Sequence, residues 1–140
     1  MKISISTKSP AWTKFEKEEW KVADLKHYGQ TPNWKKTKFK IAATNNRKNI
    51  GVLRMEVQNG VAYVEALIVG QKVRGKGIGK ELLLIAEKVA IENGAHKIYL
   101  QTGKSWDSVD FYTRTGYVIS GEFPNHYFHA DFIVMSKFLK

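Results

Sequence analysis

The chain contains no cysteine among its 140 residues. Disulfide bonds, thiol catalysis and thiolate metal sites are therefore excluded. It also lacks an apolar run of the ~20 residues that a membrane-spanning helix needs. Residues 1–6 alternate apolar and polar side chains as a strand does, and no apolar core of a signal peptide follows them. We therefore expect one domain over residues 1–140, with no membrane partner and with a cytoplasmic location by default.

Acidic residues are scarce: 13 stand against 23 lysines and arginines, which gives a formal net charge of +10. The excess is uneven, because residues 1–50 hold 12 basic side chains and only 4 acidic ones. Such a balance favours either an acidic partner, such as RNA, or a solvated basic surface. The lysines are dispersed and accompany no nucleic-acid motif, so we favour the basic surface and expect no nucleic-acid partner.

Hydrophobic periodicity and turn residues predict a mixed α+β sheet protein. Strands are expected near residues 2–6, 37–44, 50–57, 61–69, 96–101, 117–123 and 130–138, and helices near 13–27, 76–93 and 105–115. Asn59-Gly60 is a strong hairpin signal, so the strands on either side of it should be antiparallel. A right-handed crossover through the helix at 76–93 should make strand 96–101 parallel to strand 61–69.

The helix near 76–93 is amphipathic and should end at Asn93-Gly94 with a glycine cap. Its apolar positions form the stripe that should contact the sheet, namely Ile78, Leu82, Ile85, Ala86, Val89 and Ala90. Its charged positions should face water, namely Lys80, Glu87, Lys88 and Glu92.

The run Arg74-Gly75-Lys76-Gly77-Ile78-Gly79 connects an apolar strand to this helix. Amides at a helix N-terminus lack partners within the chain and attract anions, and glycines let a phosphate approach the main chain closely. A dinucleotide-binding motif would need glycine where Lys80 stands, and a P-loop would need glycine at Arg74 and a hydroxyl at Glu81. The run therefore predicts a site for some other phosphate-bearing ligand, and the alternative is a surface turn rich in Gly and Lys.

The pattern Gln/Arg-x-x-Gly-x-Gly/Ala, matched by Arg74, Gly77 and Gly79, resembles the signature of the GNAT superfamily of acyl-CoA-dependent N-acetyltransferases. A second segment, residues 105–117, is similar to the family pattern Asn-x-x-Ala-x-x-Phe-Tyr-x-x-x-Gly-Phe. It has Phe111, Tyr112 and Gly116 in place, but Ser105 and Ser108 replace the usual Asn and Ala. This segment should be a short helix with Ser105 as its N-cap and Gly116 as its stop. The resemblance covers roughly residues 61–122.

The resemblance implies a mostly antiparallel, twisted sheet whose central parallel strands splay apart to bind coenzyme A, with helices on both faces. It implies acetyl-CoA as cofactor, an amine-bearing acceptor, and transfer of the acetyl group by direct attack of the amine; a homodimer is also compatible with it. The main-chain amides near Leu67 to Val69 would meet the oxyanion and hold the pantetheine arm. The cofactor-binding residues expected by resemblance are Leu67, Ile68, Val69, Arg74, Gly75, Lys76, Gly77, Ile78, Gly79, Lys80, Ser105 and Tyr112.

Acetyl transfer requires a neutral amine and a proton for the departing thiolate, and free aliphatic amines have a pKa near ~10.4. Tyr112 is the expected acid, since in the family the matching hydroxyl lies beside the sulfur; the alternative is a packing role like that of Phe111. Glu65 is the expected base, because a carboxylate within the apolar strand 61–69 is costly unless it is paired or functional. The alternative is a solvated Glu65 paired with Arg54 or Lys40.

Other residues are alternatives for the base or candidates for the acceptor site. In some relatives the base lies on the next strand, but Gln101 stands there and accepts no proton usefully. Histidine has a suitable pKa, so His126 and His129 are the next candidates for the base. The acceptor-site candidates are Trp34, Trp106, His126, Tyr127 and His129. His126, His129 and Asp131 are of residue types that bind metal ions. No second group of such residues accompanies them in the sequence, so no metal site is expected.

The sequence is also compatible with two other classes of protein. One is a non-catalytic module that binds acyl-CoA, which would keep the glycine loop without chemistry. The other is a basic domain associated with nucleic acid, whose binding would depend steeply on salt.

Overall fold

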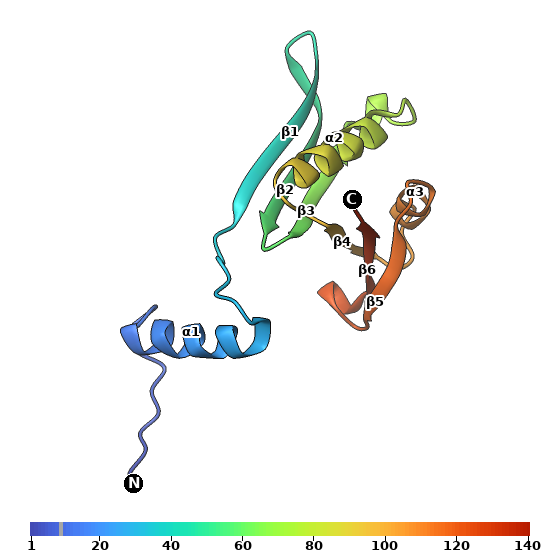
Figure 1. Cartoon of the computed structure of the whole chain (residues 1–140). Helices are drawn as coiled ribbons and strands as arrows, with labels where there is room; N and C mark the ends of the chain where they lie inside the picture. The colour runs from blue at the N-terminus through green and yellow to red at the C-terminus, as the bar shows by residue number, and fades with distance from the viewer. Residues whose placement is uncertain (9) are drawn as a thin grey trace. The chain divides into compact units, whose positions relative to one another are not determined.

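The structure is a computed structural model that describes residues 1–8 and 10–140, and it contains two compact units, Met1–Asn33 and Trp34–Lys140 (Figure 1). The first unit carries α1 (Lys14–Tyr28), which confirms the helix expected near residues 13–27. The Thr13 hydroxyl accepts a hydrogen bond of 3.1 Å from the Glu16 amide at the N-terminus of α1. Gly29, at φ 70°, ends the helix in the left-handed conformation that glycine adopts without strain.

The strand expected over residues 2–6 is wrong. Residues 1–6 form no strand, and the side chains of Ile3 and Ile5 are exposed. Alternation of apolar and polar residues is compatible with a strand, but a strand is stable only when a neighbouring strand supplies the hydrogen-bond ladder and a packed face.

The second unit is built on a six-stranded sheet with strand order β1-β2-β3-β4-β6-β5. The strands are β1 (Thr37–Asn45), β2 (Lys48–Gln58), β3 (Val61–Val69), β4 (Lys97–Gly103), β5 (Val118–Phe123) and β6 (Phe132–Phe138). Neighbouring strands are antiparallel except β3 and β4, which are parallel. The expected mixed α+β fold, with a mostly antiparallel sheet and a central parallel pair, is confirmed.

Tight turns set the register of the long N-terminal strands of this sheet. Asn59 and Gly60 both have positive φ, at 47° and 84°, between the paired residues Gln58 and Val61. This is the two-residue hairpin that Asn-Gly predicts, because its backbone twist matches the twist of the strands. Asn46 and Arg47 form the corresponding turn between β1 and β2, also with positive φ.

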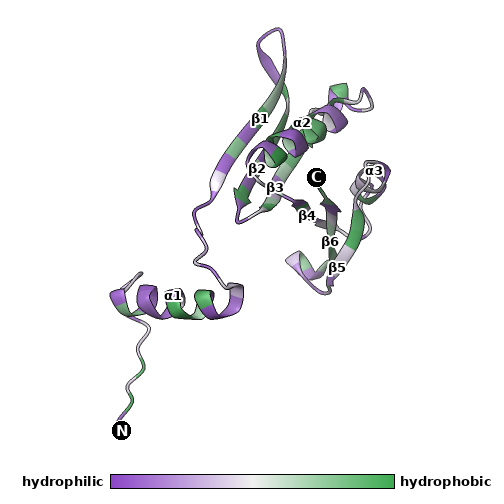
Figure 2. Cartoon of the chain, in the orientation of Figure 1, coloured by the Kyte–Doolittle hydropathy of each residue, from purple (hydrophilic) through white to green (hydrophobic). Residues whose placement is uncertain are grey.

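Helix α2 (Ile78–Glu92) lies along β1, β2 and β3, and Figure 2 shows alternating hydrophobic and hydrophilic bands along it. The amide of Gly94 donates to Ile91 and that of Ala95 donates to Ala90, at 3.0 and 2.9 Å, which is a Schellman cap. The glycine stop at Gly94 is therefore confirmed.

Two details of the predicted α2 stripe are wrong. Ile85 is 49% exposed, whereas Leu83 is only 1% exposed, and Glu87 is buried at 8% exposure instead of facing water. The prediction of one apolar stripe assumes that α2 packs only against the sheet. α2 contacts the sheet on one side, and on another side Leu83 and Glu87 line a cavity that the end of α3 (Ser108–Arg114) also lines, so its buried face is wider than the stripe.

No helix among the described residues has the length and apolar character needed to cross a membrane. Short 3-10 turns, η1 (Gln71–Val73) and η2 (Tyr127–His129), connect β3 to the glycine loop and β5 to β6.

Candidate active site

The central parallel strands separate part of the way along the sheet. β3 pairs with β4 only from Val61↔Lys97 to Tyr63↔Tyr99. Beyond this point β4 stays paired with β6 as far as Gly103, and β3 stays paired with β2 as far as Val69. The sheet is therefore open between the C-terminal parts of β3 and β4, as the family resemblance implies.

The glycine loop lies at the end of β3. Gly75 and Gly77 have φ values of 78° and 82°, and a Cβ atom on either would have no atom within 4 Å. Both positions therefore need glycine for their backbone conformation and border open space. The Nε atom of Arg74 donates to the Val69 carbonyl at 3.1 Å, which fastens the loop to the strand.

The amides of this loop have no protein acceptors. Within residues 1–8 and 10–140, the amides of residues 74–80 donate to no main-chain or side-chain acceptor. The next amide along the chain, that of Glu81, donates to the Gly77 carbonyl at 3.0 Å. These amides lie at the positive end of the α2 dipole. The loop has the geometry of an anion-binding site.

A cleft of about 1010 Å³ lies between the end of β3, the glycine loop and α3. All of the cofactor-binding residues expected from the sequence line it, except Lys76 and Ser105. The sequence did not identify the other lining residues, which are Val73, Asp107, Ser108, Phe111, Arg114 and Thr115. Ser108, Phe111 and Thr115 recur at helical spacing, so the pattern of α3 itself could have revealed which face meets the cleft.

Helix α3 begins later than expected. Asp107, not Ser105, occupies the N-cap position, because the chain first turns at Trp106, whose amide donates to the Gly103 carbonyl at 3.1 Å. The Ser105 cap is therefore wrong. The Ser108 hydroxyl lies 2.6 Å from the hydroxyl of Thr102 on β4, so the serine that replaces the family alanine has a partner. Gly116, at φ 98°, ends the helix as expected.

Tyr112 contributes to both the core and the cleft. Its side chain is 8% exposed, and its ring makes edge contacts with Phe111 and Tyr117 at centroid distances of 5.0 and 5.7 Å. Among the described residues its hydroxyl has no hydrogen-bond partner, yet it is not sealed from solvent. Burial raises the pKa of the Tyr112 phenol to about 12, so the group is protonated at neutral pH.

Glu65 lies at a β-bulge. Arg54 pairs with Ala66 and Met55 with Val64, so Glu65 is the extra residue of β3. Its side chain is 30% exposed, and its Oε2 atom is 4.0 Å from Nη1 of Arg54, so the pairing with Arg54 that the sequence allowed is present. Glu65 does not line the large cleft.

Several aromatic side chains gather around Phe132 at the start of β6. The ring centroids of Trp106, Tyr127 and His126 lie 5.3, 5.2 and 5.5 Å from that of Phe132, and Phe123 stacks on His126 at 5.0 Å. Three acceptor-site candidates therefore share one cluster, and the sequence missed Phe132 and Phe123 as its members.

The other two acceptor candidates lie outside this aromatic cluster. The Nδ1 atom of His129 is 2.8 Å from Oδ1 of Asn125, and the Trp34 carbonyl accepts a hydrogen bond of 2.6 Å from Gln58. In the described part of the chain, no group of three or more His, Asp or Glu side chains is arranged to hold a metal ion.

Burial raises the pKa of Tyr63 above its usual value, with further increases from Tyr99, Tyr127 and Glu65. The rings of Tyr63 and Tyr99 are 4.8 Å apart where the parallel strands are still paired. Tyr127 and Glu65 therefore lie near a tyrosine pair that marks the beginning of the opening in the sheet.

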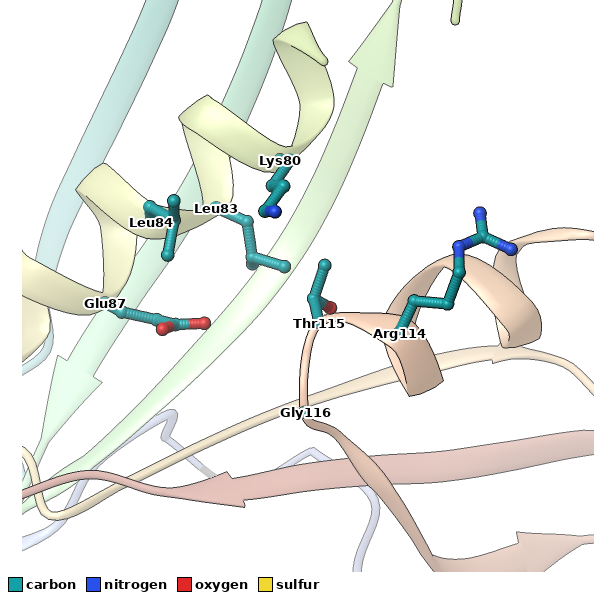
Figure 3. A pocket seen from close by; sticks show the side chains of 7 residues that line it. All are labelled: Lys80, Leu83, Leu84, Glu87, Arg114, Thr115 and Gly116. Carbon is teal, nitrogen blue, oxygen red and sulfur yellow. The ribbon is translucent and has the colours of Figure 1, made fainter.

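A smaller cavity of about 300 Å³ lies between α2 and the end of α3 (Figure 3). Lys80, Arg114 and Thr115 line both this cavity and the cleft. Two cationic side chains are thus placed where the two cavities meet.

A sheet opened between two parallel strands, with unpaired amides at a helix N-terminus beside the opening, defines a domain that can hold an elongated ligand bearing phosphates. Residues 8–117 match the Acetyltransferase (GNAT) family. The chain belongs to this family.

Solved structures share the fold. An acetyltransferase from Bacillus cereus ATCC 14579 matches with a TM-score of 0.71 and 22% identity, over 94% of this chain and 96% of that one. An aminoglycoside 6'-N-acetyltransferase, solved with coenzyme A, matches with a TM-score of 0.64 and 23% identity, over 72% of each chain. The ribosomal-protein-S18-alanine N-acetyltransferase from Escherichia coli matches with a TM-score of 0.69 and 18% identity, over 74% of this chain and 70% of that one. No curated protein sequence matches the chain.

Proposed function

We propose that the chain is a single N-acetyltransferase domain that moves an acetyl group from acetyl-CoA to a primary amine. One observation carries the proposal: the unpaired amides of residues 74–80 lie at the end of an opening between β3 and β4, in a cleft that Tyr112 also lines. An aminoglycoside acetyltransferase of the same fold is solved with coenzyme A.

The residues of the cleft fit acetyl-CoA, which supplies an acetyl group activated as a thioester. Unpaired amides and open space at Gly75 and Gly77 suit a diphosphate, and Lys80 adds positive charge beside them. The edge of β3 that faces the opening, at Leu67 to Val69, lacks a neighbouring strand and offers main-chain groups to an extended ligand. Because the Nε atom of Arg74 already donates to the Val69 carbonyl, Arg74 acts mainly by holding the loop in place rather than by binding the diphosphate.

Glu65 is the proposed base. Near neutral pH an aliphatic amine is largely protonated and lacks the lone pair that attacks a carbonyl carbon. A carboxylate that is partly exposed, with a single ion pair at 4.0 Å, remains able to accept a proton directly or through water. Glu65 lies outside the cleft, so this role requires the amine to reach the acetyl group from the side of Glu65, along the stretch where β3 and β4 are not paired.

Tyr112 is the proposed acid. A pKa of about 12 keeps the phenol protonated, but it exceeds the ~8.5 of a thiol by about 3.5 units, so complete proton transfer costs about 5 kcal/mol. Tyr112 therefore acts chiefly as a hydrogen-bond donor toward the leaving sulfur, in a site where burial strengthens such a bond.

The aromatic cluster around Phe132 is the proposed wall of the acceptor site. It brings together Trp106, His126 and Tyr127, and both Tyr127 and Glu65 act electrostatically on Tyr63. His126 is stacked among rings, which makes it better suited to shape this site than to move a proton.

Release of free thiol from acetyl-CoA, measured across a panel of amines and followed by mass spectrometry of the products, tests the proposal. We expect amine-dependent thiol release together with a gain of one acetyl group on the acceptor. Thermal stabilisation by acetyl-CoA without thiol release with any amine would instead indicate a binding module. Nucleic-acid binding that falls steeply with salt and that coenzyme A does not displace would indicate a basic nucleic-acid-associated domain.

A further inference from the structure

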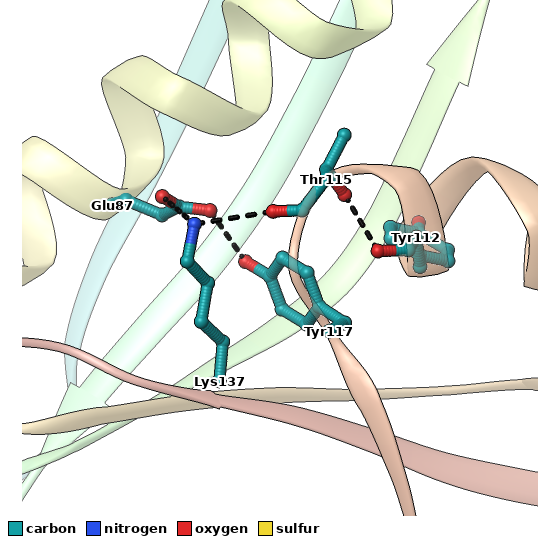
Figure 4. Close-up of polar contacts among 5 residues, drawn as sticks. All are labelled: Glu87, Tyr112, Thr115, Tyr117 and Lys137. Carbon is teal, nitrogen blue, oxygen red and sulfur yellow. Dashed lines mark hydrogen bonds and ion pairs between the residues drawn. The ribbon is translucent and has the colours of Figure 1, made fainter.

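A buried carboxylate behind Tyr112 is held by two donors from different parts of the chain (Figure 4). Glu87 of α2 accepts a hydrogen bond of 2.9 Å from the Tyr117 hydroxyl at Oε2 and one of 2.9 Å from the Lys137 ammonium at Oε1. No buried polar side-chain atom of the described residues is left without a partner. The group is a satisfied polar network within an otherwise apolar core.

The Lys137 ammonium also holds the end of α3. It donates to the Thr115 carbonyl at 3.1 Å, and Thr115 is the C-cap of that helix. A Cβ atom on Gly116 would lie 3.3 Å from Cε of Lys137, so the lysine stem packs closely on this turn. One ammonium therefore joins α2, α3 and β6.

The same turn holds Tyr112. The Tyr112 carbonyl accepts hydrogen bonds from the amides of Thr115 and Tyr117 at 3.1 and 3.0 Å and from the Thr115 hydroxyl at 2.9 Å. The Tyr117 ring, whose hydroxyl is bound to Glu87, lies edge-on to the Tyr112 ring at 5.7 Å. The network thus reaches Tyr112 through the main chain of the cap and through a ring contact.

Packing alone does not hold this turn. The cavity of about 300 Å³ borders Thr115 and Gly116 on one side, so fewer side chains press on the end of α3 there. The Lys137–Glu87 ion pair is only partly buried, with side chains 29% and 10% exposed, and such a pair has little advantage in stability over apolar residues of similar volume. Its hydrogen bonds instead join the end of α3 to α2 at a defined geometry.

We propose that Glu87 and Lys137 are positioning residues, which fix the last turn of α3 so that the Tyr112 hydroxyl keeps its place in the cleft. This inference rests on the proposed role of Tyr112. It assigns no chemistry to Glu87 or Lys137, since neither lines the large cleft. Displacements of about 1 Å in a catalytic group are enough to slow an enzyme by up to ~100-fold.

The test uses a variant that leaves no charge unpaired, Glu87→Gln with Lys137→Met. A control variant, Lys36→Met with Glu56→Gln, removes a lysine–glutamate pair of 3.4 Å elsewhere on the sheet. We expect the first variant to stay folded and to keep its KM for acetyl-CoA, while its kcat falls about tenfold. We expect the control to keep the kcat of the wild type.

A double-mutant comparison with Tyr112→Phe shows whether Glu87 and Lys137 position Tyr112 or only stabilise the fold. In the wild type, Tyr112→Phe should lower kcat about a hundredfold, whereas in the Glu87→Gln, Lys137→Met background, where about tenfold is already lost, the same substitution should lower it by only about a further tenfold. An equal loss in both backgrounds, or an unchanged kcat in the charge-free variant, would overturn the inference while leaving the proposed function intact. No effect of Tyr112→Phe in the wild type would overturn the role of Tyr112 and this inference with it.

Amide hydrogen exchange gives a readout that does not depend on activity. Peptides covering residues 112–117 should exchange faster in the charge-free variant than in the wild type or the control, while peptides from the middle of α2 should not change. Unchanged exchange of residues 112–117 would contradict the inference whether or not acetyl transfer is observed.

Discussion

The carboxylate of Glu65 on β3 lies 4.0 Å from the guanidinium of Arg54 on β2, at the point where a bulge interrupts the register of the two strands. Both side chains are partly exposed, and ion pairs of this kind contribute little to stability, commonly between 0 and ~1 kcal/mol. The pairing with Arg54 therefore orients the Glu65 carboxylate and still leaves it able to accept a proton. The bulge explains how a charge is accommodated in an apolar strand, since it turns the extra residue toward solvent.

Glu65→Gln should lower kcat/KM by about a hundredfold near pH 7, because the amide cannot accept a proton. The deficit should shrink as the pH rises toward ~10.4, where the amine becomes neutral without help. The measurement is a pH–rate profile with one amine acceptor. Glu56→Gln is the matched control, because it removes a carboxylate from the neighbouring strand. A constant deficit at every pH would exclude Glu65 as the base.

Gly77→Glu should abolish binding of acetyl-CoA, because it places a carboxylate against the amides that we assign to the diphosphate. Gly77→Gln is the matched control: it has the same size and the same backbone strain at φ 82°, without the charge. Titration calorimetry should show a loss of at least about a hundredfold for Glu and a clearly smaller loss for Gln. Wild-type affinity in a folded Gly77→Glu variant would refute the loop assignment.

Tyr112→Phe should slow turnover by roughly a hundredfold and leave the affinity for acetyl-CoA nearly unchanged, because the ring keeps its packing and only the donor is lost. Single-turnover kinetics would separate the chemical step from binding. Tyr28→Phe provides a comparison in which an exposed phenol on α1 is lost, at a residue that does not line the cleft. If Tyr112→Phe matches the wild type in rate and in pH profile, another group donates to the sulfur.

The buried phenols should make the protein sensitive to alkali. Burial raises the pKa of Tyr112 to about 12, and burial together with the charge of Glu87 raises the pKa of Tyr117 further. A pKa that is higher in the folded state contributes stability that is complete below the unfolded value of ~10 and is lost as the pH rises through the folded value. For Tyr112 this loss is about 2 kcal/mol at pH 12 and approaches about 3 kcal/mol only at higher pH.

Urea unfolding at pH 8 and at several values above pH 10 would measure this loss. Tyr112→Phe should be less sensitive to alkali than the wild type, because its ring has no proton to lose, while Tyr127→Phe controls for the removal of an exposed phenol. The same alkaline loss in the wild type and in Tyr112→Phe would show that the Tyr112 phenol does not titrate with unfolding.

Much of the local structure could be predicted because its causes are local. Asn59-Gly60 forms the expected turn since only residues that tolerate positive φ fit a two-residue hairpin. Gly94 and Gly116 stop their helices for the same reason. The glycine loop is predicted from its residue types and its place before a helix, and Tyr112 from the family resemblance, and the structure places both at one cleft.

The errors arise where a partner distant in the sequence decides the outcome. Residues 2–6 have the alternation of a strand but no neighbouring strand, and Ser105 can cap a helix but the chain turns at Trp106 first. Glu87 has the helical position of a solvent-facing charge, yet it is buried because Tyr117 and Lys137, 30 and 50 residues later, supply its hydrogen bonds.

The sequence by itself determined the turns, the ends of the helices and the chemical types of the residues at the site, because each depends on backbone conformation or on a side chain's own functional groups. Only the tertiary structure decided that β3 and β4 separate after Tyr63, that the loop amides remain unpaired and that Tyr112 is fastened through Thr115 to Lys137. The reason is physical: strand pairing, burial and the satisfaction of buried charges are relations between distant segments, and neither segment specifies them alone.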